Sequence, residues 1–272
     1  MESPQFVGFP AMSAADPIAI LALAGRPQDL PLTPSARRRV RRVEIRLDLV
    51  DPGEWPHRVR EVERAFPASR LLATLRRRSD GGMWPDDADR QDALERILSI
   101  RGWDALDLES DAPDLEALLK QARRRAPDLR LVLSRHMFEA IEGKELADQI
   151  SHLRALAART GAQVAKWAGA VMDLEEDGPE LVRILSAWDD ETVPAVFPMG
   201  AGAEPWRVAC AAVSGGWGYG HDGTGSLALG QLPWKVFDAL LGAVPRSDRW
   251  DPEWFAGISS ATALALREEV PS

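Results

Sequence analysis

The sequence is poor in cysteine and in long apolar runs, and both shortages exclude classes of protein. One cysteine, Cys210, leaves no partner for an intramolecular disulfide and no Cys-rich zinc site, so we expect a reducing, cytoplasmic setting. The first strongly apolar run, Ile18–Ala24, is far shorter than the roughly 20 residues that cross a bilayer. No basic segment precedes it, so it is a poor export signal and a better buried strand.

Positive charge is also in deficit, because 33 basic residues face 42 acidic ones and the net charge is −9. An acidic chain is repelled by nucleic acid and by anionic membranes, so neither is expected as a partner. Two arginine runs, 37–42 and 123–125, fit solvated helix faces or, alternatively, a phosphate-binding patch. No G-x-G-x-x-G fingerprint follows the first strand and no P-loop is present, which weakens a nucleotide-binding interpretation.

What the chain does contain is an alternation of strand-like and helix-like segments over 272 residues of ordinary globular composition. This pattern predicts a parallel sheet built of βαβ units, and eight units in this length predict one (β/α)₈ barrel domain over residues 1–272, with loose termini at about 1–15 and 266–272. An open doubly wound sheet is the alternative. The expected strands are Ile18–Ala24, Val43–Leu49, Leu71–Leu75, Ala105–Leu108, Leu129–Ser134, Gln163–Trp167, Val193–Met199 and Gly215–Tyr219. The expected helices are Asp89–Ile100, Asp114–Arg125, Lys144–Arg159, Pro179–Trp188 and Pro233–Leu241.

Charged residues interrupt the second expected strand at alternate positions. Glu44, Arg46 and Asp48 share one face of that strand, where unpaired charge inside a barrel is costly. They form either a structural ladder of salt bridges or a set of ligands for a polar substrate. Arg76 ends the third strand, and the loop after it contains Asp80 and two glycines, which fits a ligand loop or a plain surface turn.

A histidine and a lysine occupy the fifth and sixth strands. His136 lies at the carboxyl end of its strand, where barrels gather their chemistry, and imidazole suits proton transfer. Lys166 lies between Ala165 and Trp167, where burial disfavours a charged ammonium. A neutral amine is a nucleophile that forms an imine with a ketone. The alternative is an edge strand with Lys166 extended to water.

Polar groups suited to an anion follow the last two strands. The planar guanidinium of Arg207 suits a carboxylate, and Gln231 adds a directional donor. The pairs Gly225-Ser226 and Gly230-Gln231 precede a helical pattern, where free backbone amides hold anions, although glycine-rich stretches are commonly turns.

Taken in order, these residues resemble type I 3-dehydroquinate dehydratases over roughly Ile18 to Leu241. The resemblance is carried by the order and spacing of short motifs, which are E-x-R-x-D at 44–48, R-x-x-x-D-G-G at 76–82, S-x-H at 134–136, Lys166, M-G…R at 199–207 and G-Q at 230–231. It implies a (β/α)₈ barrel, a homodimer, and dehydration of 3-dehydroquinate through a lysine imine without metal or organic cofactor.

The resemblance also implies a role for each site residue. Lys166 forms the imine, His136 is the general acid and base, and Asp80 orients the histidine. The ring hydroxyls are held by Glu44, Arg46 and Arg76, and the substrate carboxylate by Arg207, Ser226 and Gln231.

The chain departs from the family pattern at several positions. Asp80 is shorter than the usual glutamate, and Ala22 lies where a hydroxyl residue is common. The other departures are Arg135 for asparagine, Pro198 for the serine before Met199, Trp206 for the serine before Arg207, and shifted spacings at Gly202 and between Ser226 and Gln231. Two alternatives therefore stay open: another imine-forming lyase or aldolase with a changed substrate, and a non-catalytic member that works as a binding protein.

Overall fold

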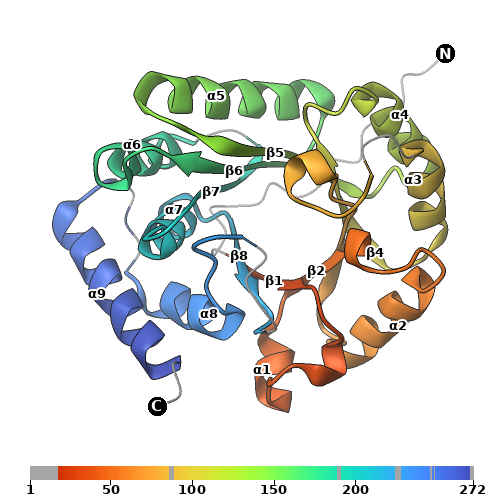
Figure 1. Cartoon of the computed structure of the whole chain (residues 1–272), viewed down its shortest axis with the longest axis horizontal. Coiled ribbons are helices and arrows are strands. Elements are labelled where there is room, and N and C mark those ends of the chain that lie inside the picture. The colour runs from red at the N-terminus through yellow and green to blue at the C-terminus, as the bar shows by residue number, and fades with distance from the viewer. Residues whose placement is uncertain are drawn as a thin grey trace.

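The fold is a barrel of eight parallel strands surrounded by helices, seen in a computed structural model (Figure 1). The structure describes residues 18–85, 89–188, 191–223, 228–245, 247 and 249–269. The strands are β1 Ile18–Leu23, β2 Arg42–Arg46, β3 Arg70–Thr74, β4 Trp103–Glu109, β5 Arg130–Ile141, β6 Val164–Val171, β7 Val193–Met199 and β8 Trp217–His221. They follow the order β7-β6-β5-β4-β3-β2-β1-β8, which confirms the predicted (β/α)₈ class over the open doubly wound sheet.

Helices cover the outer face of the strands. They are α1 Pro34–Arg39, α2 Trp55–Ala65, α3 Arg90–Ser99, α4 Leu115–Arg125, α5 Gly143–Thr160, α6 Leu174–Ser186, α7 Glu204–Ser214, α8 Trp234–Ala243 and α9 Pro252–Glu269, with 3₁₀ turns η1 Pro27–Asp29, η2 Leu47–Leu49 and η3 Arg78–Asp80. In Figure 1, α9 lies outside the ring, beside α7 and α8. No helix of the described residues is long and apolar enough to cross a membrane.

Strand alternation divides the apolar residues into two cores. On β6, Ala165 and Trp167 point outward into the large core between strands and helices. Val164 and Ala168 point inward to a smaller core within the barrel, and Lys166 shares their face. Lys166 is therefore a buried interior residue of a strand paired on both sides, not a lysine on an edge strand.

The barrel has a seam between β7 and β8, which the strand order leaves without a ladder. Val193 donates its N–H to Gln163 at 2.8 Å, so the alternate residues of β7 point their N–H groups toward β6. Pro194 and Pro198 belong to the other set of alternate β7 residues, whose N–H groups would point toward β8. Proline has no N–H group to donate there.

Several predicted boundaries were wrong. Strand β2 ends at Arg46 because the chain turns into η2, so Asp48 is not on the strand face. Helix α6 begins at Leu174, where the Asp173 side chain caps two backbone amides, and Pro179 lies within the helix rather than at its start. Helix α9 continues to Glu269, into the tail expected to be loose from residue 266. The other expected loose end, 1–15, lies outside the described residues.

Candidate active site

The predicted site residues converge on one cavity of the barrel, although His136 lies within its strand and not at the predicted end, because β5 continues to Ile141. They line one cavity of about 220 Å³, which receives Glu44, Arg46, Arg76, Asp80, His136, Lys166, Arg207 and Gln231. Ser226, which the sequence also assigns to the site, lies outside the described residues. Eight positions that are far apart in the sequence therefore come together around one small space, as the barrel topology requires.

The amine of Lys166 is held between two carboxylates. Its Nζ lies 2.9 Å from Oδ2 of Asp107 and 3.1 Å from Oε1 of Glu44, and the Tyr219 ring centre is 4.2 Å away. Thr74 donates to the same Glu44 oxygen at 2.9 Å. The apolar neighbours from which the sequence predicts the surroundings of the amine, Ala165 and Trp167, point to the other core, and the amine itself contacts two carboxylates.

Asp107 is a supporting residue that sequence reasoning missed. It accepts hydrogen bonds from Arg76 Nη2 at 2.8 Å, Ser134 Oγ at 2.5 Å and Lys166 Nζ at 2.9 Å. Burial alone would raise the pKa of Asp107, but the charges of Arg76 and Lys166 outweigh it and hold that pKa well below its usual value. The signal was present in strand β4, where Asp107 and Glu109 alternate with leucines.

Arg76 donates three hydrogen bonds to protein acceptors. Its Nη1 donates to Glu109 at 3.1 Å and to Ser134 at 2.8 Å, while Nη2 donates to Asp107. Burial lowers the pKa of Arg76, but the charges of Asp107 and Glu109 have the larger effect and raise this pKa above its ordinary value, so the guanidinium stays charged. Arg46 is likewise paired, because it forms a two-pronged contact with Asp48 at 2.8 Å on each prong. A ladder of buried ion pairs thus underlies the cavity floor.

His136 faces the cavity as a neutral imidazole. Burial first, and then the charges of Arg76 and Lys166, lower the pKa of His136 well below 6.5, against an opposing effect of Asp107. Its Nδ1 is buried and has no hydrogen-bond partner within the described residues. A neutral imidazole is in the protonation state that a general base requires.

Asp80 lies on the cavity wall but contacts Arg77 instead of His136. Its Oδ2 accepts from Arg77 Nε at 2.6 Å and from Ser79 Oγ at 3.3 Å. The structure therefore does not show the histidine-orienting contact that the resemblance implies for this carboxylate.

Arg207 supplies a buried positive charge to the cavity, without an ion pair to any carboxylate of the described residues. It lies in the first turns of α7, where Nε donates to the Pro198 carbonyl at 2.9 Å and Nη2 to the Leu229 carbonyl at 3.0 Å. Burial lowers the pKa of Arg207 to about 10, with a smaller opposing effect of Glu204. Among the described residues, no carboxylate forms an ion pair with this guanidinium, so its charge is available to an anion.

The departures from the family pattern lie mostly away from this cavity. Pro198 has the outward parity of β7, and Trp206 stacks on Phe255 of α9 with ring centres 3.8 Å apart. Arg135 points to the outside of β5, whereas Ala22 and Asp80 line the cavity. Ala22 and Asp80 are therefore the substituted residues that change the cavity lining.

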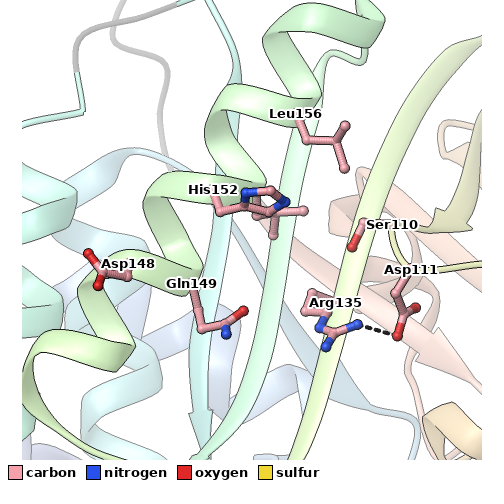
Figure 2. Close-up of a pocket in the computed structure, with 8 residues that line it drawn as sticks. Ser110, Asp111, Arg135, Asp148, Gln149, His152 and Leu156 are labelled. Carbon is pink, nitrogen blue, oxygen red and sulfur yellow. Dashed lines mark hydrogen bonds and ion pairs between the residues drawn. The ribbon is translucent and has the colours of Figure 1, made fainter.

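A second cavity, of about 480 Å³, lies outside the barrel between β5 and α5 (Figure 2). His152 and Gln149 reach into it from α5, and Arg135 pairs with Asp111 on its other side. None of the residues expected to carry chemistry lines it. No group of His, Cys, Asp and Glu side chains in the described part of the chain is arranged to hold a metal ion.

A (β/α)₈ barrel with a buried lysine, a neutral histidine and an unpaired arginine around one cavity is an enzyme architecture of the imine-forming kind. A match to the type I 3-dehydroquinase family covers residues 28–243. The chain belongs to this family. The match begins after β1 and ends before α9.

Individual relatives agree with this assignment. The chain is 30% identical over 175 residues to a 3-dehydroquinate dehydratase of Methanopyrus kandleri, covering 64% of this chain and 74% of that protein. It is 28% identical over 211 residues to one of Pyrobaculum aerophilum, covering 74% and 63%. The solved structure of a 3-dehydroquinate dehydratase from Geobacillus kaustophilus superposes with a TM-score of 0.68 at 20% identity, over 84% of this chain and 91% of that one.

Proposed function

We propose that this protein is a hydro-lyase that dehydrates 3-dehydroquinate to 3-dehydroshikimate through an imine on Lys166, as a step of the shikimate pathway. The observation that carries the proposal is the placement of His136 on β5 and Lys166 on the adjacent strand β6, where both line one cavity. Family membership supplies the substrate class. All of the chemistry is assigned to side chains, with no metal or organic cofactor.

Lys166 begins the reaction. The ammonium must lose one proton before its nitrogen attacks, and Glu44 and Asp107 are the acceptors within hydrogen-bond distance. The amine then adds to the substrate ketone, and loss of the carbonyl oxygen as water leaves a protonated imine. This positive nitrogen draws electrons from the neighbouring carbon and makes its C–H bond acidic.

His136 moves the protons. The neutral imidazole takes a proton from the carbon beside the imine carbon, and the electron pair left behind forms an enamine. The enamine pair then expels the hydroxyl group on the next carbon, and the imidazolium gives it the proton, so that water leaves. Hydrolysis of the imine releases the conjugated ketone and frees Lys166, so the net change is the loss of one water.

The remaining residues hold the substrate. Arg207 binds the substrate carboxylate, because it is the cavity's cation without an acidic partner in the described chain, and Ser226 and Gln231 assist it. Glu44, Arg46 and Arg76 face the ring hydroxyls from the opposite wall. Asp80 lines the same cavity as His136, and the resemblance gives this carboxylate the role of orienting the imidazole.

The test is reductive trapping. Borohydride added with 3-dehydroquinate should attach the ligand irreversibly, and peptide mass mapping should place the adduct on Lys166. Lys166→Ala should give no adduct, whereas the matched control Lys120→Ala removes an exposed lysine of α4 and should leave trapping intact. His136→Ala should still form the adduct but lose turnover.

The same experiment separates the alternatives. Measurable dehydration without any adduct would overturn the imine. Trapping of another keto acid, with none of 3-dehydroquinate, would favour a lyase or aldolase with a changed substrate. Absence of both trapping and turnover would favour a non-catalytic binding protein.

Three further expectations remain proposals that rest on the family and the sequence. We propose a homodimer, a cytoplasmic location in keeping with the one buried cysteine, and no nucleic-acid or membrane partner for this acidic chain. Light scattering at micromolar concentration tests the first: a dimer mass supports it, and a purely monomeric mass contradicts it.

A further inference from the structure

The carboxylate of Asp80 is committed to a neighbour within its own turn. Arg77 donates from Nε to Oδ2 of Asp80 at 2.6 Å, and both side chains are buried. Ser79 adds a longer contact of 3.3 Å to the same oxygen. Burial lowers the pKa of Arg77, but the hydrogen bond and charge of Asp80 outweigh that effect and raise this pKa above its ordinary value.

Arg77 is itself anchored at its far end. Its Nη2 donates to Oδ1 of Asp111 at 2.6 Å, and the second oxygen of Asp111 pairs with Arg135 (Figure 2). The guanidinium is therefore held by two carboxylates, one at Nε and one at Nη2. A planar fork fixed in this way sets the position of the Asp80 carboxylate as well.

The histidine in the same cavity lacks the partner that a nearby carboxylate would supply. Nδ1 of His136 is buried without a hydrogen bond among the described residues, although Asp80 lines the same cavity. The charged groups that act on the ring from the packed elements are Arg46 of β2, Arg76 after β3, Asp107 of β4 and Lys166 of β6. Three of these four are cations, so an added carboxylate would change the balance strongly.

We propose that Arg77 is a positioning residue that withholds the Asp80 carboxylate from His136 and thereby keeps the imidazole a neutral, weak base. The consequence of this arrangement for catalysis rests on the proposed function: a His136 that stays neutral at lower pH extends the acid limb of the activity profile, because the base remains unprotonated there.

The test is a double-mutant cycle read by NMR titration of the histidine ring, with His136→Ala used to assign the signal among the four histidines. Arg77→Ser should raise the pKa of His136 by about one unit or more, because the freed carboxylate can accept from Nδ1. Asp80→Asn should change that pKa by only a few tenths in the wild-type background. In the Arg77→Ser background, Asp80→Asn should reverse most of the rise.

Controls separate this effect from simple loss of charge. Arg78→Ser removes an exposed arginine from the next position and should leave the His136 titration unchanged. If Arg77→Ser does not fold, Arg77→Gln keeps a longer polar side chain without the charge, and the same direction is expected. A rise that persists in Arg77→Ser/Asp80→Asn, or an equal effect of Asp80→Asn in both backgrounds, would overturn the proposal.

The acid limb of kcat/KM for 3-dehydroquinate gives the second readout, and it should move to higher pH in Arg77→Ser and return in the double variant. A protein without dehydratase activity would refute the proposed function while leaving the ring titration to decide the role of Arg77. The two failures are therefore distinguishable.

Discussion

Asp107→Asn tests the idea that the cavity floor is an ion-pair network centred on one buried carboxylate. The wild-type side chain is buried and accepts from Arg76, Lys166 and Ser134. Asparagine has about the same size, but it lacks the negative charge, and its NH₂ group would be placed among the cations Arg76 and Lys166. Removing one partner of a buried ion pair costs about 3–5 kcal/mol, so we expect the free energy of unfolding to fall by that amount.

Urea unfolding at pH 7 measures this loss. Asp238→Asn is the matched control, since it breaks an ion pair with Arg39, whose side chain is 62% exposed, and such surface pairs contribute about 0–1 kcal/mol. A loss below about 1 kcal/mol in Asp107→Asn would refute the view that the buried network depends on this carboxylate.

The pH dependence of the same variant has a definite sign. The pKa of Asp107 in the folded protein lies well below the value of about 3.9 for an unfolded chain. Its stabilising contribution is therefore fully present above about pH 4 and is lost as the pH falls through the lower folded-state value. The stability difference between wild type and Asp107→Asn should shrink over that acid range, and a difference that grows on acidification would contradict the assignment.

Two other predictions concern Arg207 and the outer layer. Arg207→Ala should weaken binding of a carboxylate substrate by about 1.5–3 kcal/mol, or about 10- to 150-fold, and Arg207→Lys should have an intermediate effect. Titration calorimetry in an inactive His136→Ala background measures the affinity. An unchanged affinity would mean that the substrate carboxylate is bound elsewhere. Gly178→Ala should lower the free energy of unfolding by about 1–3 kcal/mol, because the added Cβ would lie 2.6 Å from the Trp206 ring. In α9, the Cβ added by Gly257→Ala would meet nothing within 4 Å, so this variant should be more stable by up to about 1 kcal/mol. Equal melting shifts for the two glycines would refute this packing argument.

The strand pattern could be predicted from the sequence because buried parallel strands appear as apolar runs. The polar residues that interrupt those runs then marked the cavity, since alternation puts Glu44 and Lys166 on inward faces. The same alternation in β4 pointed to Asp107, but a strand ending in charged residues also resembles a solvated edge. Nothing local in the sequence separates these two cases.

The pairing of Asp80 was beyond sequence reasoning for a different reason. A motif places a carboxylate in a loop, but its partner depends on competing cations brought near by other strands. Arg77 is three residues from Asp80, and Asp111 is thirty-four residues from Arg77, so these contacts depend on how β3 and β4 end side by side. The predicted start of helix α6 was wrong for a similar reason, because Pro179 resembles a start signal although the side chain of Asp173 caps the helix earlier.

The proline-bearing seam between β7 and β8 has a consequence for how the barrel tolerates change. In a fully closed barrel, the stagger of every ladder is tied to strand tilt and diameter, so a shift in one strand is transmitted around the ring. Here the strand order begins at β7 and ends at β8, and Pro194 and Pro198 remove two of the N–H donors that β7 would direct toward β8. Small changes in register or strand length can be absorbed at this junction, while the ladders of β6 with β5 and β7, which contain Lys166 and His136, keep their geometry.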